Sequence, residues 1–473
     1  MPRALSPAPR WPLRLAGAID ELNRRIGLVA IWLVLLCSLV TAANAIIRYS
    51  SGALLWLESR TGFGVFGWLY SLYANNSNAL SDSSWYMFAA IVMLGGAWTL
   101  KVNAHVRVDL IYGAVSERTR TWIDLLGGLF FLVPLCMLPV LSGKRRDHQM
   151  HPGAHHHLCA RERLREADPM IDFVRANMAP LMFGGLVLFM LIGYPAAFSL
   201  SAVGLFFGIA ALQFHLIEPE FLGNLAYQLY GVLSNDLLLA VPFFTLMGVI
   251  LEKSGLAEDL LEGFGQLFGG IRGGLSYAVI FVGAIMGAIT GTVAASVISM
   301  GLISLPVMMR YGYSVRHATG VIAASGTIAQ LIPPSLVLIV LASQLSQSAG
   351  AMYVGATGAS IVQVLLFAAW VLVLSILRPK LVPALPPEAR TLRGRALAVK
   401  LVRGMVPSLA LIFIVLGTIF LGLVTPTEAG AMGVVGALAL AAFNRRLTWP
   451  MLWDGMAATM RLTSMVIFIL LGS

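Results

Sequence analysis

Two clusters of small, hydroxyl-bearing residues interrupt strongly apolar stretches, at residues 290–296 (TGTVAAS) and 324–334 (ASGTIAQLIPP). A polar break at membrane depth is costly, because an unpaired backbone group finds no water there. Such breaks persist where the freed carbonyl and hydroxyl oxygens line a cavity or hold an ion. We therefore predict that these two clusters form half of a transport site. The candidate residues are Thr290, Gly291, Thr292, Ser296, Ser325, Gly326, Thr327, Pro333 and Pro334.

The chemistry that suits these clusters is the binding of a sodium ion and a carboxylate. Oxygen atoms at helix breaks are suitable Na⁺ ligands, and the N-termini of half-helices attract anions. Pro333 and Pro334 lack backbone donors and therefore free upstream carbonyls. We single out Thr292, Ser325 and Thr327 as candidate Na⁺ ligands. The alternative is close packing, since Gly, Ala, Ser and Thr let transmembrane helices approach one another.

A third polar group follows at residues 425–428 (TPTE), and Thr425, Thr427 and Glu428 complete the candidate set. A carboxylate within a membrane helix is by default a candidate for function. The alternative is a capping box, in which Thr425 caps a helix and Glu428 bonds back to it. We favour the cap, with a role in ordering the site. Arg48 and Arg107 are expected to reach lipid headgroups.

Catalytic chemistry has no comparable signal in this sequence. No metal-protease, phosphate-loop or nucleophile-elbow motif is present, so we expect neither an enzyme nor a bound cofactor. Residues 142–168 are rich in histidine and basic residues and also contain Cys159. A zinc site and a disordered linker are two interpretations of this segment. We favour a third, in which a reading-frame error has replaced a transmembrane span.

The elements that position these groups are membrane helices. Hydrophobic residues make up 58% of the 473 residues and charged residues 11%, and the mean hydropathy is +0.83. This composition predicts an all-α polytopic membrane protein. The net charge of +10 does not indicate nucleic-acid binding, because the basic residues lie in short loops between apolar runs. The basic N-terminus is expected in the cytoplasm, as is the basic linker at 378–403.

The apolar runs give the expected order of elements. We predict spans at 26–47, 85–100, 122–141, 181–207 (broken at 193–195), 237–251, 318–345 (broken at 325–334), 349–377, 409–424 and 434–443. Interfacial helices are expected at 54–73 and 217–235, and an amphipathic surface segment at 252–270. One leg of the 277–309 segment has about 12 residues, or ~18 Å, which is short of the ~30 Å membrane core. We therefore predict a re-entrant hairpin with its tip at 290–296. The last run, 462–471, is too short to span.

Four motifs occur in the order of a known family: residues 255–257 (GLA), 310–313 (RYGY), 332–335 (IPPS) and 426–431 (PTEAGA). From about residue 178 onward the chain resembles the large membrane subunit of tripartite ATP-independent periplasmic (TRAP) transporters. Residues 26–141, with NAHVRVD at 103–109, resemble the small subunit of the same family. The resemblance implies a fusion with a small-subunit-like helical bundle at 1–141, a polar linker at 142–172 and an elevator-type transport domain at 173–473.

The resemblance also implies a function. It implies Na⁺-coupled uptake of an organic acid, either a carboxylate or a sugar acid, across a bacterial inner membrane. The substrate would be delivered by a periplasmic binding protein, and the permease would otherwise contact membrane lipid. Two departures stand out: segment 142–168 takes the place of a fourth span, and a second hairpin facing the first is missing. The alternative expectation is therefore a truncated membrane fragment unable to transport.

Overall fold

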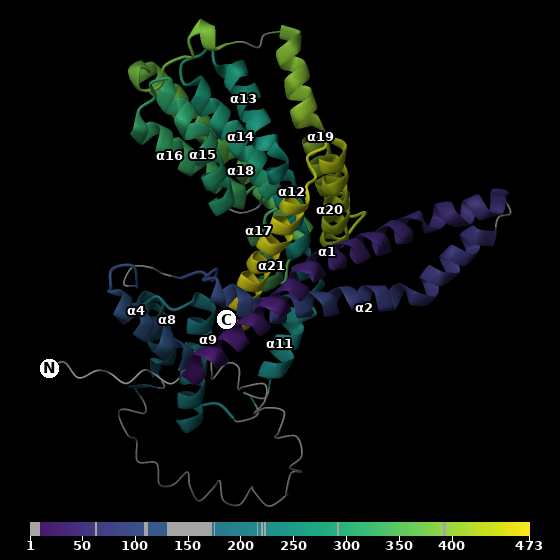
Figure 1. Ribbon diagram of the computed structural model, residues 1–473, viewed down its shortest axis with the longest axis vertical. Coiled ribbons are helices and arrows are strands. Elements are labelled where there is room, and N and C mark those ends of the chain that lie inside the picture. The colour runs from purple at the N-terminus through teal and green to yellow at the C-terminus, as the bar shows by residue number, and fades with distance from the viewer. Residues whose placement is uncertain are drawn as a thin grey trace, which may run out of the picture. The chain divides into compact units, whose positions relative to one another are not determined.

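A computed structural model describes residues 10–61, 64–107, 112–129, 173–174, 176–214, 216–218, 221, 224–290, 293–390 and 394–473. Within these ranges all the regular elements are helices, as the ribbon shows (Figure 1). Seven of the described helices are long and apolar enough to cross a membrane: Ala16–Ser51, Tyr73–Lys101, Ala196–Gln213, Asp236–Gly255, Ala349–Leu377, Pro426–Phe443 and Trp449–Gly472. The predicted all-α polytopic membrane protein is confirmed.

The chain divides into two structural units. The first contains residues 1–24, 92–234 and 463–473. Its complete helices are α4 (Glu117–Gly127), α8 (Met178–Ile192), α9 (Ala196–Gln213) and α11 (Leu225–Leu233). Gly193 ends α8 at a φ of 92°, so the predicted break at 193–195 is present. Tyr194, Phe198 and Ala202 form a small core beyond this break.

The second unit contains residues 25–91 and 235–462. Its complete helices are α12 (Asp236–Leu251), η4 (Glu252–Leu256), α13 (Ala257–Phe268), α14 (Gly274–Thr290), α15 (Val293–Arg310), α16 (Val315–Thr327), η5 (Ile328–Gln330), α17 (Leu336–Gln344), α18 (Ala349–Leu377), η6 (Pro379–Leu381), η7 (Pro387–Ala389), α19 (Gly394–Phe420) and α20 (Pro426–Phe443). Three longer helices, α1 (Arg10–Thr61), α2 (Gly64–Lys101) and α21 (Trp449–Gly472), contribute to both units.

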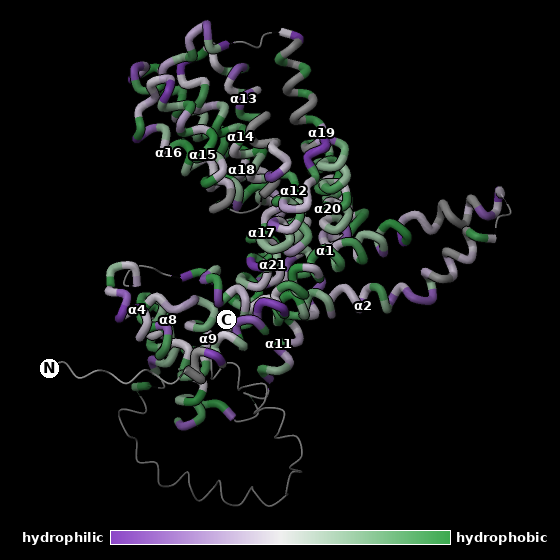
Figure 2. Tube along the Cα trace, in the orientation of Figure 1, coloured by the Kyte–Doolittle hydropathy of each residue, from purple (hydrophilic) through white to green (hydrophobic). Residues whose placement is uncertain are grey.

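Helices α12 and α20 form the centre of the second unit. Most of α12 is buried, and hydrophobic residues follow both helices along their length (Figure 2). Glycines on α20 allow the close approach. A Cβ added at Gly430 would lie 3.1 Å from Phe243 Cβ, and one at Gly433 would lie 2.5 Å from Met247 Sδ. Small residues on α20 therefore receive the large apolar side chains of α12.

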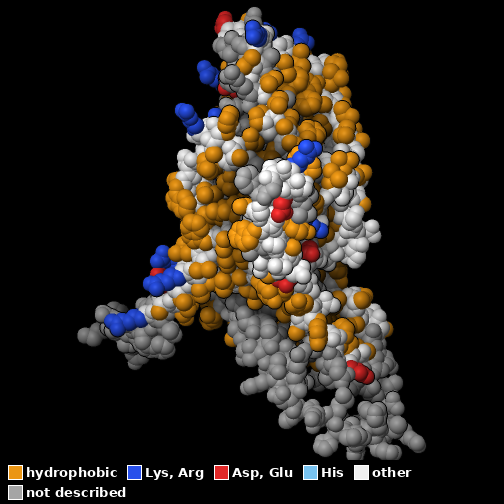
Figure 3. All heavy atoms as spheres, turned by 90° about the vertical axis from the view of Figure 1, so that its right-hand side faces the viewer, with side chains coloured by type: hydrophobic (Ala, Val, Ile, Leu, Met, Phe, Trp, Pro, Cys, Tyr) orange, Lys and Arg blue, Asp and Glu red, His pale blue; other side chains and the backbone are white. Residues whose placement is uncertain are grey.

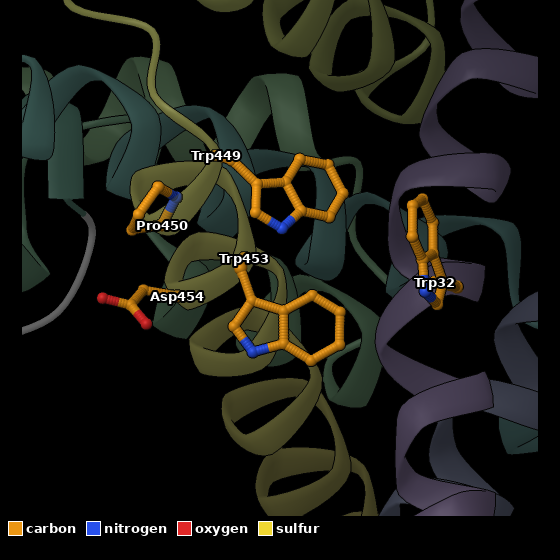
Figure 4. A pocket seen from close by; sticks show the side chains of 5 residues that line it. All are labelled: Trp32, Trp449, Pro450, Trp453 and Asp454. Atoms are coloured by element: carbon orange, nitrogen blue, oxygen red, sulfur yellow. The ribbon is translucent and has the colours of Figure 1, made fainter.

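Polar contacts join α1 to α2 within the second unit. Thr41 Oγ1 donates to Ser84 Oγ at 2.9 Å, and Asn44 Nδ2 donates to Ser81 Oγ at 3.2 Å. At another part of α1, Trp32 meets two tryptophans of α21 (Figure 4). The ring centroids of Trp32 and Trp449 are 5.6 Å apart. Side-chain contacts therefore hold both α2 and α21 against α1.

Several predicted elements differ in extent. The interfacial helix at 54–73 is wrong, because α1 continues to Thr61 and α2 begins at Gly64. The run at 462–471 belongs to the 24-residue helix α21, which is long enough to span. The leg after the hairpin tip is an 18-residue helix, α15, rather than about 12 residues. Part of the 378–403 linker is also helical, because α19 begins at Gly394.

Other predictions agree with the helix bounds. Helix α18 occupies 349–377 as expected, and the span predicted at 318–345 is broken between α16 and α17. Helix α11 lies within the predicted 217–235 segment, and α13 within 252–270. Most of the predicted 122–141 span and all of the 142–168 segment lie outside the described residues.

Candidate functional site

The first predicted cluster lies at the tip of a helical hairpin. Helix α14 ends at Thr290 and α15 begins at Val293, so the boundary between the two helices falls within the predicted tip. Gly291 and Thr292 lie outside the described residues, as does the side chain of Thr290. Ser296 is fully buried, and its hydroxyl has no hydrogen-bond partner among the described residues.

The second predicted cluster is a broken helix. Helix α16 ends at Thr327, a 3₁₀ turn follows, and α17 begins only at Leu336. The bond between Pro333 and Pro334 is cis. The Ser335 hydroxyl donates to the carbonyl of Gln330 at 2.6 Å and thereby closes the non-helical segment on itself. The break therefore stands where glycine and two prolines predicted it.

Small residues in these clusters bring the hairpin against the broken helix. A Cβ added at Gly283 of α14 would lie 2.7 Å from Ser325 Cβ, and one at Gly326 would lie 2.1 Å from Val297 Cγ2 of α15. Gly287 approaches the backbone of Ala329 in the same way, at 2.6 Å. Close packing thus accounts for Gly326. Close packing does not exclude the binding of an ion by the hydroxyls of Ser325 and Thr327.

The two hydroxyls of the break keep acceptor capacity. Ser325 Oγ donates to the carbonyl of Ile322 at 2.9 Å, and Thr327 Oγ1 donates to that of Ala324 at 2.7 Å. Each hydroxyl has one proton and two lone pairs, so both oxygens remain able to ligate a cation. Ser325 is buried and Thr327 is exposed. No cluster of three or more His, Cys, Asp and Glu side chains suited to a metal occurs in the described ranges.

The third predicted group forms the N-terminus of α20. Thr425 Oγ1 accepts from the backbone N–H of Glu428 at 3.3 Å, and Glu428 Oε2 accepts from that of Thr425 at 3.2 Å. This is a complete capping box, so the interpretation favoured from the sequence is confirmed. The Thr427 hydroxyl donates to the backbone carbonyl of Asp236, at the start of α12.

The Glu428 carboxylate also accepts hydrogen bonds from two side chains of α1. Arg48 Nη1 donates to Oε1 at 2.8 Å, and the Tyr49 hydroxyl donates to Oε2 at 2.9 Å. The Glu428 side chain is 10% exposed, whereas that of Arg48 is 60% exposed. The prediction that Arg48 reaches lipid headgroups is wrong, because a nearly buried carboxylate needs a partner. The sequence feature that could have indicated this ion pair is Glu428 itself, because an acidic residue at membrane depth needs a cationic partner from another span.

Arg107 is likewise held by protein groups rather than by lipid. Its Nη1 donates to Asp124 at 3.1 Å and its Nη2 to Asn103 Oδ1 at 2.8 Å. The guanidinium also lies over the ring of Tyr112, 5.1 Å from the centroid. Here too the expectation was wrong, since three partners within the first unit hold this guanidinium.

The start of α12 lies between two of the predicted groups. Asn235 caps α12 by accepting from Leu237 N at 2.9 Å, and its Nδ2 donates to Ser343 Oγ of α17 at 3.1 Å. The backbone carbonyl of the next residue, Asp236, accepts a hydrogen bond from the Thr427 hydroxyl of α20. Among the described residues no hydrogen bond or ion pair links Ser296, Ser325 or Thr327 directly to Thr425–Glu428. The hairpin and the break form one group, and the α20 cap forms another.

Two family models match the chain. "Tripartite ATP-independent periplasmic transporter, DctM component" matches residues 183–473. "Tripartite ATP-independent periplasmic transporters, DctQ component" matches residues 70–153. The first match alone includes more than half of the chain.

Individual relatives agree with these matches. The "Uncharacterized protein YgiK" of Salmonella typhimurium is 33% identical over 64% of this chain and 67% of its own length. The "C4-dicarboxylate TRAP transporter large permease protein DctM" of Pseudomonas aeruginosa is 32% identical over 50% of this chain and 54% of its own length. The "Isethionate TRAP transporter permease protein DctMQ" of Oleidesulfovibrio alaskensis is 27% identical over 62% of this chain and 44% of its own length.

The matched region thus spans between 44% and 67% of the length of these relatives. It contains the hairpin, the broken helix and the capped helix α20. Together with the seven candidate spans, these matches place the chain among membrane transport permeases. The chain belongs to the tripartite ATP-independent periplasmic (TRAP) transporter permeases and carries DctQ-type and DctM-type sequence in one polypeptide.

Proposed function

We propose that this chain is the membrane permease of a Na⁺-coupled secondary transporter that imports an organic acid. The observation that carries the proposal is the packing of the α14–α15 hairpin against the break between α16 and α17. A break of this kind is expected to persist in a membrane where its oxygen atoms bind an ion. The ion-binding residues are proposed to be Ser325 and Thr327, together with Thr292 at the hairpin tip.

The organic acid is proposed to bind beside the ion. Helices α15 and α17 begin at Val293 and Leu336, and the N-terminus of a helix carries a partial positive charge that favours a carboxylate. Na⁺ and the acid would then neutralise each other in a site of low dielectric. This mutual stabilisation is the physical basis proposed for coupling, since either ligand alone binds less well.

The moving part is proposed to be the helix group from α14 to α17. Its members meet through glycine contacts that leave little room for sliding. Helices α12 and α20 would form the support, because Glu428 anchors the start of α20 to Arg48 and Tyr49 of α1. An elevator-type motion would carry the first group past the second.

The substrate class follows from the charge that such a site accepts. The matched relatives are named for a C4-dicarboxylate and for isethionate, and both are small organic anions. We propose a small organic acid, delivered by a periplasmic substrate-binding protein. The proposed location is a bacterial inner membrane, with the basic N-terminus and residues 378–403 on the cytoplasmic side.

Reconstitution tests this proposal. The chain is purified, inserted into liposomes and supplied with its binding protein and a panel of radiolabelled dicarboxylates, sulfonates and sugar acids. Uptake is expected only with an inward Na⁺ gradient, and it should vanish when K⁺ replaces Na⁺ or when the binding protein is omitted. Uptake that is equal in Na⁺ and K⁺ would refute ion coupling, and no uptake of any acid would refute the function.

A further inference from the structure

A cavity of about 380 Å³ lies in the second unit between α13, α14, α15 and the segment 385–389. Its walls are mainly apolar, with Leu261, Val279, Ile303, Val307 and Met308 among them. The volume is in the range of small-molecule sites, about 300–1,000 Å³. Its lining begins some way from the hairpin tip, since Ile303, the first lining residue of α15, is roughly 15 Å along the helix from Val293. The cavity is therefore separate from the proposed ion site.

One end of this cavity lies among the loops that join the helices. Leu275 at the start of α14 and Tyr311 just beyond α15 line this end, together with Gln266 near the end of α13. Gln266 Nε2 donates to the carbonyl of Ala389 at 3.0 Å, and Leu385 N donates to that of Gly269 at 2.9 Å. The segment 385–389 is thus fixed as a rim across the helix ends.

The rim carries more basic than acidic residues, with Glu388 as the acid of the 385–389 segment. Arg272, Arg310, Lys380 and Arg390 lie in or beside the turns that form it, and none of them has an ion pair among the described residues. Lys and Arg side chains are visible at the upper end of the molecule (Figure 3), where Figure 1 places these turns. Unpaired cations beside an apolar cavity call for an anionic group with an apolar part.

Arg390 is directly adjacent to the cavity lining. It follows the lining residue Ala389, and a Cβ added at Gly270 would lie 3.0 Å from its Nη1. Its Nε is buried and has no hydrogen-bond partner among the described residues. The same is true of Gln266 Oε1. The rim thus offers an unused guanidinium donor and an unused amide acceptor at the mouth of an apolar space.

We propose that this cavity binds an anionic phospholipid. An acyl chain would occupy the space between α13 and α15, and the phosphate would pair with Arg390, whose planar guanidinium suits phosphate oxygens. A hydroxyl of the headgroup would donate to Gln266 Oε1. The rim lies on the proposed cytoplasmic side, where anionic lipids are held by basic pockets between membrane helices.

Two other polar residues on the wall fit this arrangement. Glu262 is exposed and lies one helical turn before Gln266. The Ser304 hydroxyl, buried and without a partner in the described chain, would lie along the path of the acyl chain.

Native mass spectrometry of the full chain tests the proposal. The delipidated protein is titrated with phosphatidylglycerol or with phosphatidylethanolamine carrying the same acyl chains. We expect phosphatidylglycerol to bind more tightly, and Arg390→Gln to weaken it about fivefold, as expected for the loss of one cation near a membrane surface. The matched control is Arg445→Gln, which removes an exposed cation from the α20–α21 turn and is expected to leave the affinity unchanged.

A second pair of variants tests the cavity itself. Gly265 lines it, and a Cβ added there would meet Leu275 Cδ2 at an ordinary 3.5 Å. Gly265→Ala should therefore retain the lipid, whereas Gly265→Leu should fill the space and lose it. The proposal is overturned if the two lipids bind alike, if Arg390→Gln and Arg445→Gln bind alike, or if both Gly265 variants retain the lipid. Displacement of the lipid by glycerol phosphate alone would also overturn it, because the site would then recognise a free phosphate.

Discussion

Replacing Glu428 by alanine should destabilise the second unit far more than replacing its partner Arg48. Glu428 accepts hydrogen bonds from Arg48 and Tyr49 and from both the hydroxyl and the backbone N–H of Thr425. Its side chain is only 10% exposed. Removing it breaks the side-chain half of the capping box and leaves four donors without their acceptor. We expect a loss of about 2–4 kcal/mol, because part-buried donors without an acceptor cost about 1–3 kcal/mol and a broken helix cap costs about 1 kcal/mol.

Arg48→Ala has a different physical consequence. The Arg48 side chain is 60% exposed, and without it Glu428 still accepts from Tyr49 and Thr425. We therefore expect a loss of about 1 kcal/mol, as for an exposed ion pair. Lys253 and Asp454 provide a matched control, since they pair at a similar 2.9 Å but are 38% and 60% exposed. Alanine at either position should cost no more than about 1 kcal/mol.

The assay is reversible unfolding in mixed micelles titrated with sodium dodecyl sulfate, applied to both single variants and to the double variant. The double-mutant cycle isolates the coupling between Arg48 and Glu428. We expect a coupling of about 1 kcal/mol, with the rest of the Glu428 loss independent of Arg48. Equal losses for the two single variants would refute the reasoning, because they would mean that burial of Glu428 carries no extra cost.

Two further changes have defined outcomes. Gly326→Ala places a Cβ 2.1 Å from Val297 Cγ2 and should destabilise by about 1–3 kcal/mol. Gly320→Ala on the same helix meets nothing within 4 Å and should be neutral or stabilising, and equal effects in the same unfolding assay would contradict this packing. Burial lowers the pKa of His317 below 6.5, so the unfolded chain binds more protons in mildly acidic solution and stability should fall as pH drops through about 6.5. His317→Gln should weaken this dependence of stability on pH. An unchanged pH dependence would mean that another group causes it.

Features with a local cause could be predicted from the sequence. Pro333 and Pro334 cannot donate backbone hydrogen bonds, so the break after Thr327 follows from covalent structure alone. The spacing of Thr425 and Glu428 likewise contains the geometry of a capping box. These signals lie within a few residues of the structure they produce. For that reason the end of α16 and the start of α20 were predictable.

Features that depend on distant partners could not be predicted. Arg48 and Glu428 are 380 residues apart, and the sequence indicates only that the acid needs some cation. The apolar cavity is formed by three helices and a loop, none of which is unusual alone. The continuation of α1 to Thr61 and the start of α2 at Gly64 were missed because polar residues at 75–78 indicated a loop. No proline occurs between residues 12 and 134, however, so nothing in the covalent chain stops these helices.

Among the predicted ligands, Thr327 permits the sharpest measurement. Its hydroxyl is exposed and donates to a helix carbonyl at 2.7 Å. Thr319, on the same helix, is also exposed and makes the equivalent bond to Val315 at 2.9 Å, so Thr319→Val is its matched control. The two variants change the same atoms in similar surroundings. They differ only in whether the residue lies at the break.

The measurement is the Na⁺ concentration that gives half-maximal uptake in proteoliposomes. Loss of one ligand hydroxyl should raise this concentration roughly tenfold in Thr327→Val, since about 1.4 kcal/mol of binding free energy corresponds to a factor of ten. Thr319→Val should match the unaltered protein. If Thr327→Val also shows an unchanged Na⁺ requirement, its hydroxyl does not bind the coupling ion and the proposed ion site at the α16–α17 break is wrong.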